Sequence, residues 1–173
     1  NCFSAAGRDC ISIPVAVYYP LSVGTSLQTP FATVPGPVAF AKKQPEPVRY
    51  ASPGTVTLNN LLSEWLASDQ KFKVQHVPYK GGAPSITAIL ANEVRFGSLS
   101  LAVSKSLADA GKLKMLGVSS ARRSTLAPDA PTLTESAISI SSTIWVGLFT
   151  QKTVRAEING KVHSLMMEIL KDD

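Results

Sequence analysis

The sequence has few groups that carry catalytic or metal chemistry. Its 173 residues include two cysteines and two histidines, and the cysteines, Cys2 and Cys10, lie far along the chain from His76 and His163. This spacing matches no zinc-binding pattern, so no metal site is expected. Two incidental thiols near the N-terminus are the favoured interpretation of the cysteines, and a disulfide between them is the open alternative.

Recognisable catalytic motifs are also missing. The serines lack the G-x-S-x-G nucleophile elbow, and neither a Walker loop nor a G-x-G-x-x-G fingerprint occurs. His76 stands between apolar neighbours and is interpreted as a packed or hydrogen-bonded core residue. The carboxylates are scattered, and no pair of them indicates general acid–base catalysis. No catalytic residue and no cofactor are predicted, and binding without turnover is favoured over a small α/β enzyme.

No apolar run is long enough to span a membrane, and the charge is only mildly biased. Seventeen lysines and arginines against twelve acidic residues give a net charge of +5. The basic residues are spread out and are not interleaved with aromatic residues, so nucleic acid is not an expected partner. A small anion fits the same charge. The first residues, NCFSAAGRDC, lack the basic and apolar regions of a signal peptide, so none is expected in this chain.

Short strand-like segments alternate with amphipathic helical patterns. Strands are predicted over 48–52, 73–77, 94–101, 114–119 and 143–149. Helices are predicted from Leu58 (with Thr57 as N-cap), over 84–92, over 102–110 and over about 153–171. The stretch 119–142 is predicted to be a long connection with one short helix at most. Strands that alternate with helices form βαβ units, so the predicted fold class is α/β, a mostly parallel sheet flanked by helices.

The last predicted helix carries an apolar stripe that needs a surface to cover. That surface can come from the preceding sheet, from the first twenty residues, or from another chain. We expect above-average exposure along this stripe or self-association through the C-terminal helix. The stripe consists of Val154, Ile158, Val162, Leu165, Met166, Ile169 and Leu170.

Two turns of similar chemistry connect a predicted strand to a predicted helix. They are residues 52–57, Ser-Pro-Gly-Thr-Val-Thr, and residues 79–84, Tyr-Lys-Gly-Gly-Ala-Pro. Glycine permits close backbone approach, Pro84 suits the first position of a helix, and a helix N-terminus attracts anions. In a parallel sheet both turns lie at the carboxyl ends of the strands, where ligands bind. On local chemistry alone, ordinary strand-to-helix turns are the favoured alternative.

The second turn also carries a family resemblance. The segment Val77–Pro84, V-P-Y-K-G-G-A-P, followed by Ala91–Val94, resembles a segment of the Bug-type extracytoplasmic receptors. These receptors are the substrate-binding components of tripartite tricarboxylate transporters. The resemblance runs from about Asp9 to the end of the chain. Other segments that agree in order and spacing are 31–34, 39–42, 50–54, 110–114, 117–124, 128–132 and 145–148.

The resemblance implies a periplasmic binding protein-like (type II) fold whose two lobes close on a small carboxylate solute. Residues 19–144 would form the second lobe. Residues 1–18 would be a remnant of the first lobe with a hinge strand, and 145–173 the return hinge strand with one first-lobe helix. The first lobe would therefore be incomplete.

The resemblance also implies a site, partners and a compartment. The ligand would meet residues of both turns, and the protein would act in the periplasm with membrane transporter subunits. The implied ligand-binding residues are Ser52, Gly54, Thr55, Thr57, Tyr79, Lys80, Gly81 and Gly82.

Three departures from the family pattern leave alternatives open. Arg95 stands where the family usually has aspartate, Thr55–Thr57 replaces part of a glycine- and serine-rich run, and 150–153 replaces a Pro-Ala-Gly-Thr-Pro run. The leading hypothesis is non-catalytic carboxylate binding as all or part of a transporter receptor. The first alternative is a truncated receptor that acts as a protein-interaction or sensing module without binding solute. The second, less favoured, is a small α/β enzyme.

Overall fold

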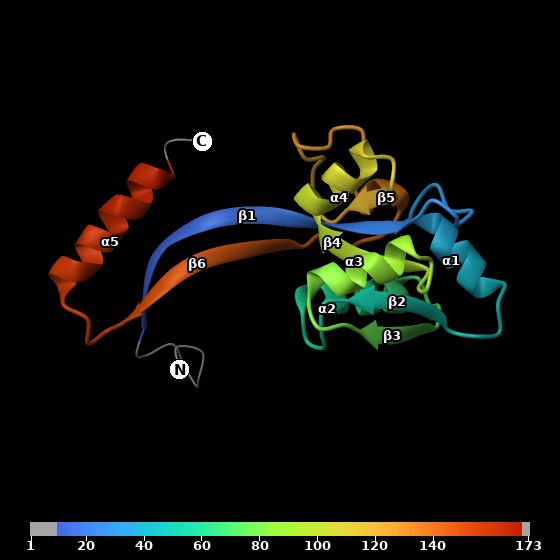
Figure 1. Ribbon diagram of the computed structural model, residues 1–173, viewed down its shortest axis with the longest axis horizontal. Helices are drawn as coiled ribbons and strands as arrows, with labels where there is room; N and C mark the ends of the chain where they lie inside the picture. The colour runs from blue at the N-terminus through green and yellow to red at the C-terminus, as the bar shows by residue number, and fades with distance from the viewer. Residues whose placement is uncertain (1–9, 171–173) are drawn as a thin grey trace. The chain divides into compact units, whose positions relative to one another are not determined.

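A computed structural model describes residues 10–170, in which strands and helices alternate (Figure 1). In chain order the elements are β1 (Cys10–Ser26), α1 (Pro35–Lys42), β2 (Val48–Ser52), α2 (Leu58–Asp69), β3 (Val74–Pro78), α3 (Gly82–Leu90), β4 (Phe96–Ser100), α4 (Leu101–Asp109), β5 (Leu113–Val118), the 3₁₀ turn η1 (Thr134–Ser136), β6 (Thr143–Gln151) and α5 (Ala156–Ile169).

The chain divides into two compact units. We call residues Tyr19–Thr143 the sheet unit, and the rest the terminal unit, of which 10–18 and 144–170 are described. Strand β1 contributes residues to both units and pairs with β6. No helix among the described residues combines the length and apolar character needed to cross a membrane.

The sheet has the strand order β3-β2-β4-β1-β5. Strand β2 runs parallel to both β3 and β4, whereas β1 is antiparallel to β4 and to β5. The prediction of a mostly parallel α/β sheet flanked by helices is therefore confirmed, with β1 as the antiparallel member. Because β2, β3 and β4 are parallel, their carboxyl ends lie at the same end of the sheet.

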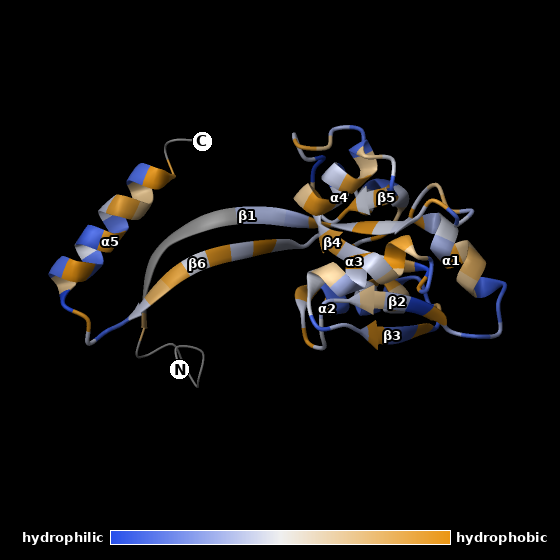
Figure 2. Ribbon diagram, viewed as in Figure 1, coloured by the Kyte–Doolittle hydropathy of each residue, from blue (hydrophilic) through white to orange (hydrophobic). Residues whose placement is uncertain are grey.

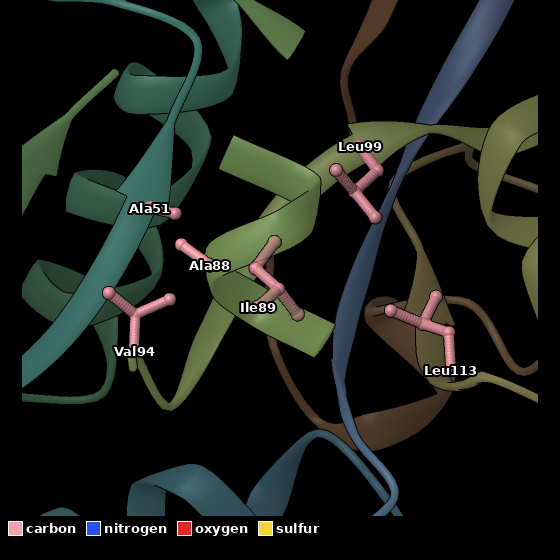
Figure 3. Close-up of a cluster of buried hydrophobic side chains, with 6 residues drawn as sticks. All are labelled: Ala51, Ala88, Ile89, Val94, Leu99 and Leu113. Carbon is pink, nitrogen blue, oxygen red and sulfur yellow. The ribbon is translucent and has the colours of Figure 1, made fainter. Parts of the chain in front are cut away.

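Helices α2 and α3 cover opposite faces of this sheet. Tyr50 and Ala51 are successive residues of β2, so their side chains point to opposite faces. The phenol of Tyr50 is hydrogen-bonded to Asn60 and Glu64 of α2. Ala51 packs with Ala88 and Ile89 of α3, and Figure 3 shows these two residues next to it, in a buried cluster with Val94, Leu99 and Leu113.

The structure corrects several boundaries expected from the sequence. Helix α3 begins at Gly82 with Gly81 as its cap, so Pro84 is the third residue of the helix and the expectation that it is the first was wrong. Helix α1, which begins at Pro35, was not predicted. The long connection after β5 contains only η1. The predicted N-cap Thr57 is confirmed, because its side chain accepts a hydrogen bond from the N–H of Asn60.

The terminal unit carries apolar side chains that are open to solvent. No residue of α5 is buried, and Leu165 and Ile169 are 51% and 66% exposed. Figure 2 shows hydrophobic residues interspersed with hydrophilic ones along this helix. On β6, Trp145, Val146 and Leu148 are exposed as well. The expected exposure of the apolar stripe is therefore found.

Cys10 is disulfide-bonded, so the interpretation of two incidental thiols was wrong. A disulfide restricts the unfolded chain and can thereby hold a small unit together when its apolar core is limited. The other cysteine of the chain, Cys2, lies outside the described residues.

Candidate functional site

The two turns singled out in the sequence are joined by backbone hydrogen bonds. The N–H of Tyr79 donates to the carbonyl of Ser52, and the N–H of Gly81 donates to the carbonyl of Pro53, both at 3.0 Å. These bonds continue the β2–β3 pairing past the strand ends. The N-termini of α2 and α3 therefore lie next to each other, although the two helices cover opposite faces. We call residues 52–59 with 79–83 the strand-end site.

Ser52 holds the first turn from inside the protein. Its side chain is fully buried, and its hydroxyl donates to the carbonyl of Gly54 at 2.8 Å. Because that hydroxyl has a single proton, its 2.6 Å contact with Nε2 of His76 requires the imidazole to be the donor. His76 in turn stacks on the ring of Tyr50, with 5.0 Å between the ring centroids. The prediction of a packed or hydrogen-bonded histidine is confirmed, but His76 is half-buried on the edge strand β3 and does not lie in the core.

Thr57 also uses its hydroxyl inside the turn. Its Oγ1 accepts from the N–H of Asn60 at 3.2 Å and donates to the carbonyl of Gly54 at 2.9 Å. Thr55, by contrast, is exposed and its hydroxyl has no hydrogen bond in the described part of the chain. The N–H groups of Leu58 and Asn59 begin the helix and have no intrahelical acceptor. The groups of this turn that are left for a ligand are mainly backbone N–H groups.

Val56, at the tip of this turn, has an unusual backbone conformation. Its φ of 60° is left-handed, which a β-branched residue rarely adopts, and its side chain is 85% exposed. Such strain persists only where the surroundings impose it, and it is frequent at ligand sites. The hydrogen bonds of Ser52 and Thr57 to Gly54 supply that constraint here.

The second turn leaves free space beside the first residues of α3. Gly81 has φ 108° and ψ 179°, which favours glycine, and no atom lies within 4 Å of a Cβ built at Gly81 or at Gly82. The N–H groups of Gly82 and Ala83 have no intrahelical acceptor because they belong to the first turn of the helix. Lys80 is exposed beside them. This turn offers amides, a positive helix end and one ammonium group, a combination that attracts anions.

The side chain of Tyr79 turns away from the start of α3. Its ring packs against the cluster that contains Ala88 and Ile89. Desolvation and, next, the nearby carboxylate of Glu93 raise the pKa of the phenol above its usual value. Because Glu93 follows the C-terminal end of α3, the phenol lies toward that end of the helix. The strand-end site therefore receives the backbone of Tyr79 rather than its phenol.

Strand β4 brings a third helix start to the same end of the sheet, and the sequence did not indicate that residues near it would lie beside the two turns. Ser98 is buried, and its hydroxyl has no hydrogen-bond partner among the described residues. The side-chain amide of Asn59 donates to the carbonyl of Ser98 at 2.8 Å, which ties α2 to β4. Ser100 then precedes α4 without a side-chain cap. The sequence could not reveal this, because β4 lies beside β2 only through the strand order.

The described residues offer little support for metal chemistry in this chain. Among positions 10–170, no group of three or more histidine, cysteine, aspartate or glutamate side chains is arranged to hold a metal ion. The residues of the two turns include no aspartate or glutamate. The strand-end site is therefore a neutral-to-positive site built of amides, hydroxyls and one lysine.

Comparison with known proteins identifies relatives over almost the whole chain. Residues 5–172 match the family described as "Tripartite tricarboxylate transporter family receptor". The chain is 33% identical over 148 residues to the "UPF0065 protein in gbd 5'region" of Cupriavidus necator, covering 84% of this chain and 44% of that protein. It therefore spans about half the length of this curated relative.

Solved structures with the same fold include two that were determined with dicarboxylates. "R. palustris Rpa4515 with adipate" matches with a TM-score of 0.86 and 21% identity, over 95% of this chain and 56% of that chain. "MatC (Rpa3494) from Rhodopseudomonas palustris with bound malate" matches with a TM-score of 0.81 and 19% identity, over 94% and 56%. These likenesses show the fold of the chain.

Proposed function

Because the chain belongs to the tripartite tricarboxylate transporter receptor family, we propose that its strand-end site binds one carboxylate group of a small solute. The observation that carries this proposal is the pair of hydrogen bonds that joins the turns after β2 and β3. They bring two helix N-termini together at a place without acidic side chains. Adipate and malate, bound by structural relatives, are dicarboxylates, so a solute of that class is the first candidate.

Recognition would rest on backbone donors. A carboxylate accepts several hydrogen bonds, and the N–H groups of Leu58, Asn59, Gly82 and Ala83 lack intrahelical acceptors. The partial positive charge at each helix start adds to this attraction. Ser52, Gly54, Thr57 and Gly81 give the turns their shape, whereas Thr55, Lys80 and Gly82 are the predicted residues best placed to touch the solute.

The buried hydroxyl of Ser98 would mark the inner end of the site, where a solute oxygen or a bridging water molecule binds. A buried hydroxyl without a partner costs roughly 1–3 kcal/mol. A water molecule or a ligand oxygen at the β4 end of the site would supply the missing partner. In this role Ser98 and Ser100 extend the site predicted from the sequence.

The wider assignment follows the family. We propose that the chain serves as all or part of a periplasmic solute receptor, which binds without turnover and delivers its solute to membrane transporter subunits. A second candidate, an interaction or sensing module, is favoured by one observation, the exposed apolar side chains of α5.

The proposal is tested by titrating ¹⁵N-labelled chain with succinate, malate and adipate and following the amide signals by NMR. We expect saturating shifts at Leu58, Asn59, Gly82 and Ala83. The expected affinity is millimolar or weaker, because two or three hydrogen bonds worth about 0.5–1.5 kcal/mol each hardly offset the entropy lost on association. Micromolar binding would show that the strand-end site is a complete receptor site.

Lys80 provides a matched pair of variants. Lys80→Gln should weaken binding severalfold, because it removes the cation beside the start of α3. Lys112→Gln removes an equal charge from an exposed lysine between α4 and β5 and should leave the affinity unchanged. Absence of any saturating shift at the four amides with all three solutes would refute carboxylate binding by this site.

A further inference from the structure

Two arginines lie side by side where β2 and β4 begin, at the opposite end of these strands from the strand-end site. The N–H of Arg95 donates to the carbonyl of Arg49 at 2.9 Å, just before the aligned pairs Tyr50–Phe96 and Ala51–Gly97. Arg49 lies in β2 and Arg95 directly precedes β4, so the two residues are neighbours where these parallel strands begin. Their side chains line the same cavity.

This placement of like charges is costly unless something compensates it. Neighbouring strands lie about 4.8 Å apart, and like charges in directly adjacent positions destabilise a sheet. Among the described residues, no carboxylate oxygen lies within 4.0 Å of either guanidinium group, since the ion pairs found there are Lys105–Asp109 and Arg123–Glu135. Neither arginine therefore forms a direct ion pair within the described chain, although the carboxylate of Glu46 lines the same cavity and that of Glu93, like Arg49, acts on the phenol of Tyr79.

The arginines line one cavity. Its volume is about 120 Å³, several times the roughly 10–15 Å³ that holds one water molecule. The remaining lining residues are Phe40, Gln44, Glu46, Pro47 and Val48. Glu46, the single carboxylate of the lining, forms no ion pair with either arginine. The cavity therefore keeps two positive charges and one negative charge.

Arg95 is held in place within this cavity. Its guanidinium group lies 5.8 Å from the centroid of the Phe40 ring, in a cation–π contact. One of its nitrogens, Nη1, donates to Oδ1 of Asn92 at 3.2 Å. Arg49 is exposed and has no side-chain hydrogen bond in the described part of the chain. One guanidinium is thus pre-oriented and the other is free to close on a ligand.

The charge around the cavity is also positive. A second hollow shares Gln44 with it and is lined by Lys42, Lys71 and Lys73. The positive electrostatic potential of these lysines attracts an anion toward the arginines.

We propose that the Arg49–Arg95 cavity is a second anion site, which binds a small oxyanion such as phosphate or a carboxylate. A guanidinium group presents paired N–H donors that match the oxygens of either group. A bound oxyanion would neutralise the like charges that the strand register forces together. The site lies at the amino ends of β2 and β4, so it is separate from the strand-end site.

NMR on the ¹⁵N-labelled full chain tests this proposal directly. Inorganic phosphate and, separately, succinate are titrated at constant ionic strength, with sodium chloride as the reference ion. We expect saturating shifts of the side-chain Nε–H signals of Arg49 and Arg95. A saturating shift with either ion supports the proposal, and the lower dissociation constant identifies the preferred group.

Three variants separate this site from general charge effects. Arg49→Gln and Arg95→Gln should each weaken binding at least about tenfold, because a charge-assisted pair of hydrogen bonds is lost. Arg122→Gln removes the same charge from an exposed arginine outside the cavity and should leave the affinity unchanged.

The wild-type signals decide the question even if a variant fails to fold. Linear, non-saturating shifts of both arginine signals with phosphate and with succinate would overturn the proposal. So would shifts confined to the amides of Gly82 and Ala83, an outcome that leaves the proposed function of the strand-end site intact.

Discussion

At the scale of residues, two hydroxyl groups of the strand-end site stabilise its first turn. Ser52 and Thr57 both bond to the carbonyl of Gly54. The role of Thr57 was visible in the sequence, because an N-cap acts on residues only three positions away. The partner of Ser52 was not, because His76 lies 24 residues further along the chain.

Thr57→Ala should lower the free energy of unfolding by roughly 1 kcal/mol, since the cap of α2 is lost. It should also weaken carboxylate binding, because the carbonyl of Gly54 loses a donor that holds the turn. Urea unfolding and the succinate titration measure the two effects. Thr57→Ser keeps the hydroxyl and is the control, and equal stability of the two variants would contradict the assigned cap.

At the scale of elements, a reciprocal pair of hydrogen bonds organises the long connection between β5 and β6. The N–H of Thr132 donates to Oε2 of Glu135 at 2.9 Å, and the N–H of Glu135 donates to Oγ1 of Thr132 at 3.0 Å. This is a capping box around the short turn η1. Arg123 also donates to both oxygens of Glu135. A few side-chain bonds thus order a segment that has little regular structure.

The hydrogen bond from the N–H of Thr132, and then the donor Arg123, hold the pKa of Glu135 below its ordinary value of 4.5. A lowered pKa in the folded state means that Glu135 contributes stability above about pH 4.5, and that this stability is lost as the pH falls through the folded-state pKa. Glu135→Gln should therefore lower the thermal unfolding midpoint at about pH 7, and the difference from wild type should vanish by about pH 2.

Melting curves of the wild type and of Glu135→Gln between about pH 2 and about pH 7 provide the measurement. Glu168→Gln is the control, because Glu168 is exposed and has no hydrogen bond or ion pair in the described residues. A Glu135→Gln difference that is the same at all pH values would contradict the assigned ionic role.

At the scale of the whole molecule, the apolar surface is unevenly distributed. The sheet unit buries side chains such as Tyr50, Phe96 and Leu66 and exposes others such as Trp65, whereas no residue of α5 is buried. Exposed apolar patches mark interaction surfaces or an aggregation liability. The chain also spans only about half of the curated relative it matches. The resemblance seen in the sequence implies that α5 belongs to the first lobe, and that assignment stays a prediction.

We expect the isolated chain to self-associate through α5, because burial of its exposed apolar side chains contributes about 25 cal/mol per Å². Sedimentation velocity measures this. Leu165→Ser and Ile169→Ser should each shift the distribution toward monomer. Lys161→Ser, at an exposed polar position of the same helix, should leave it unchanged. A chain that stays monomeric up to the highest concentration that the measurement allows would contradict the prediction.

The sequence alone determined the features that depend on neighbours along the chain. Alternating apolar patterns predicted strands and helices, and Thr57 predicted the start of α2. The segment V-P-Y-K-G-G-A-P indicated the family, and the comparisons confirmed it.

Only the tertiary structure decided which distant residues meet. The strand order β3-β2-β4-β1-β5 places Ser98 beside the first turn and Arg49 beside Arg95. Tyr79, predicted as a ligand residue, packs against α3 and directs its phenol toward Glu93. Side-chain direction follows from the packing of α3 on the sheet, and such packing joins residues far apart in sequence. Local patterns carry no information about that pairing.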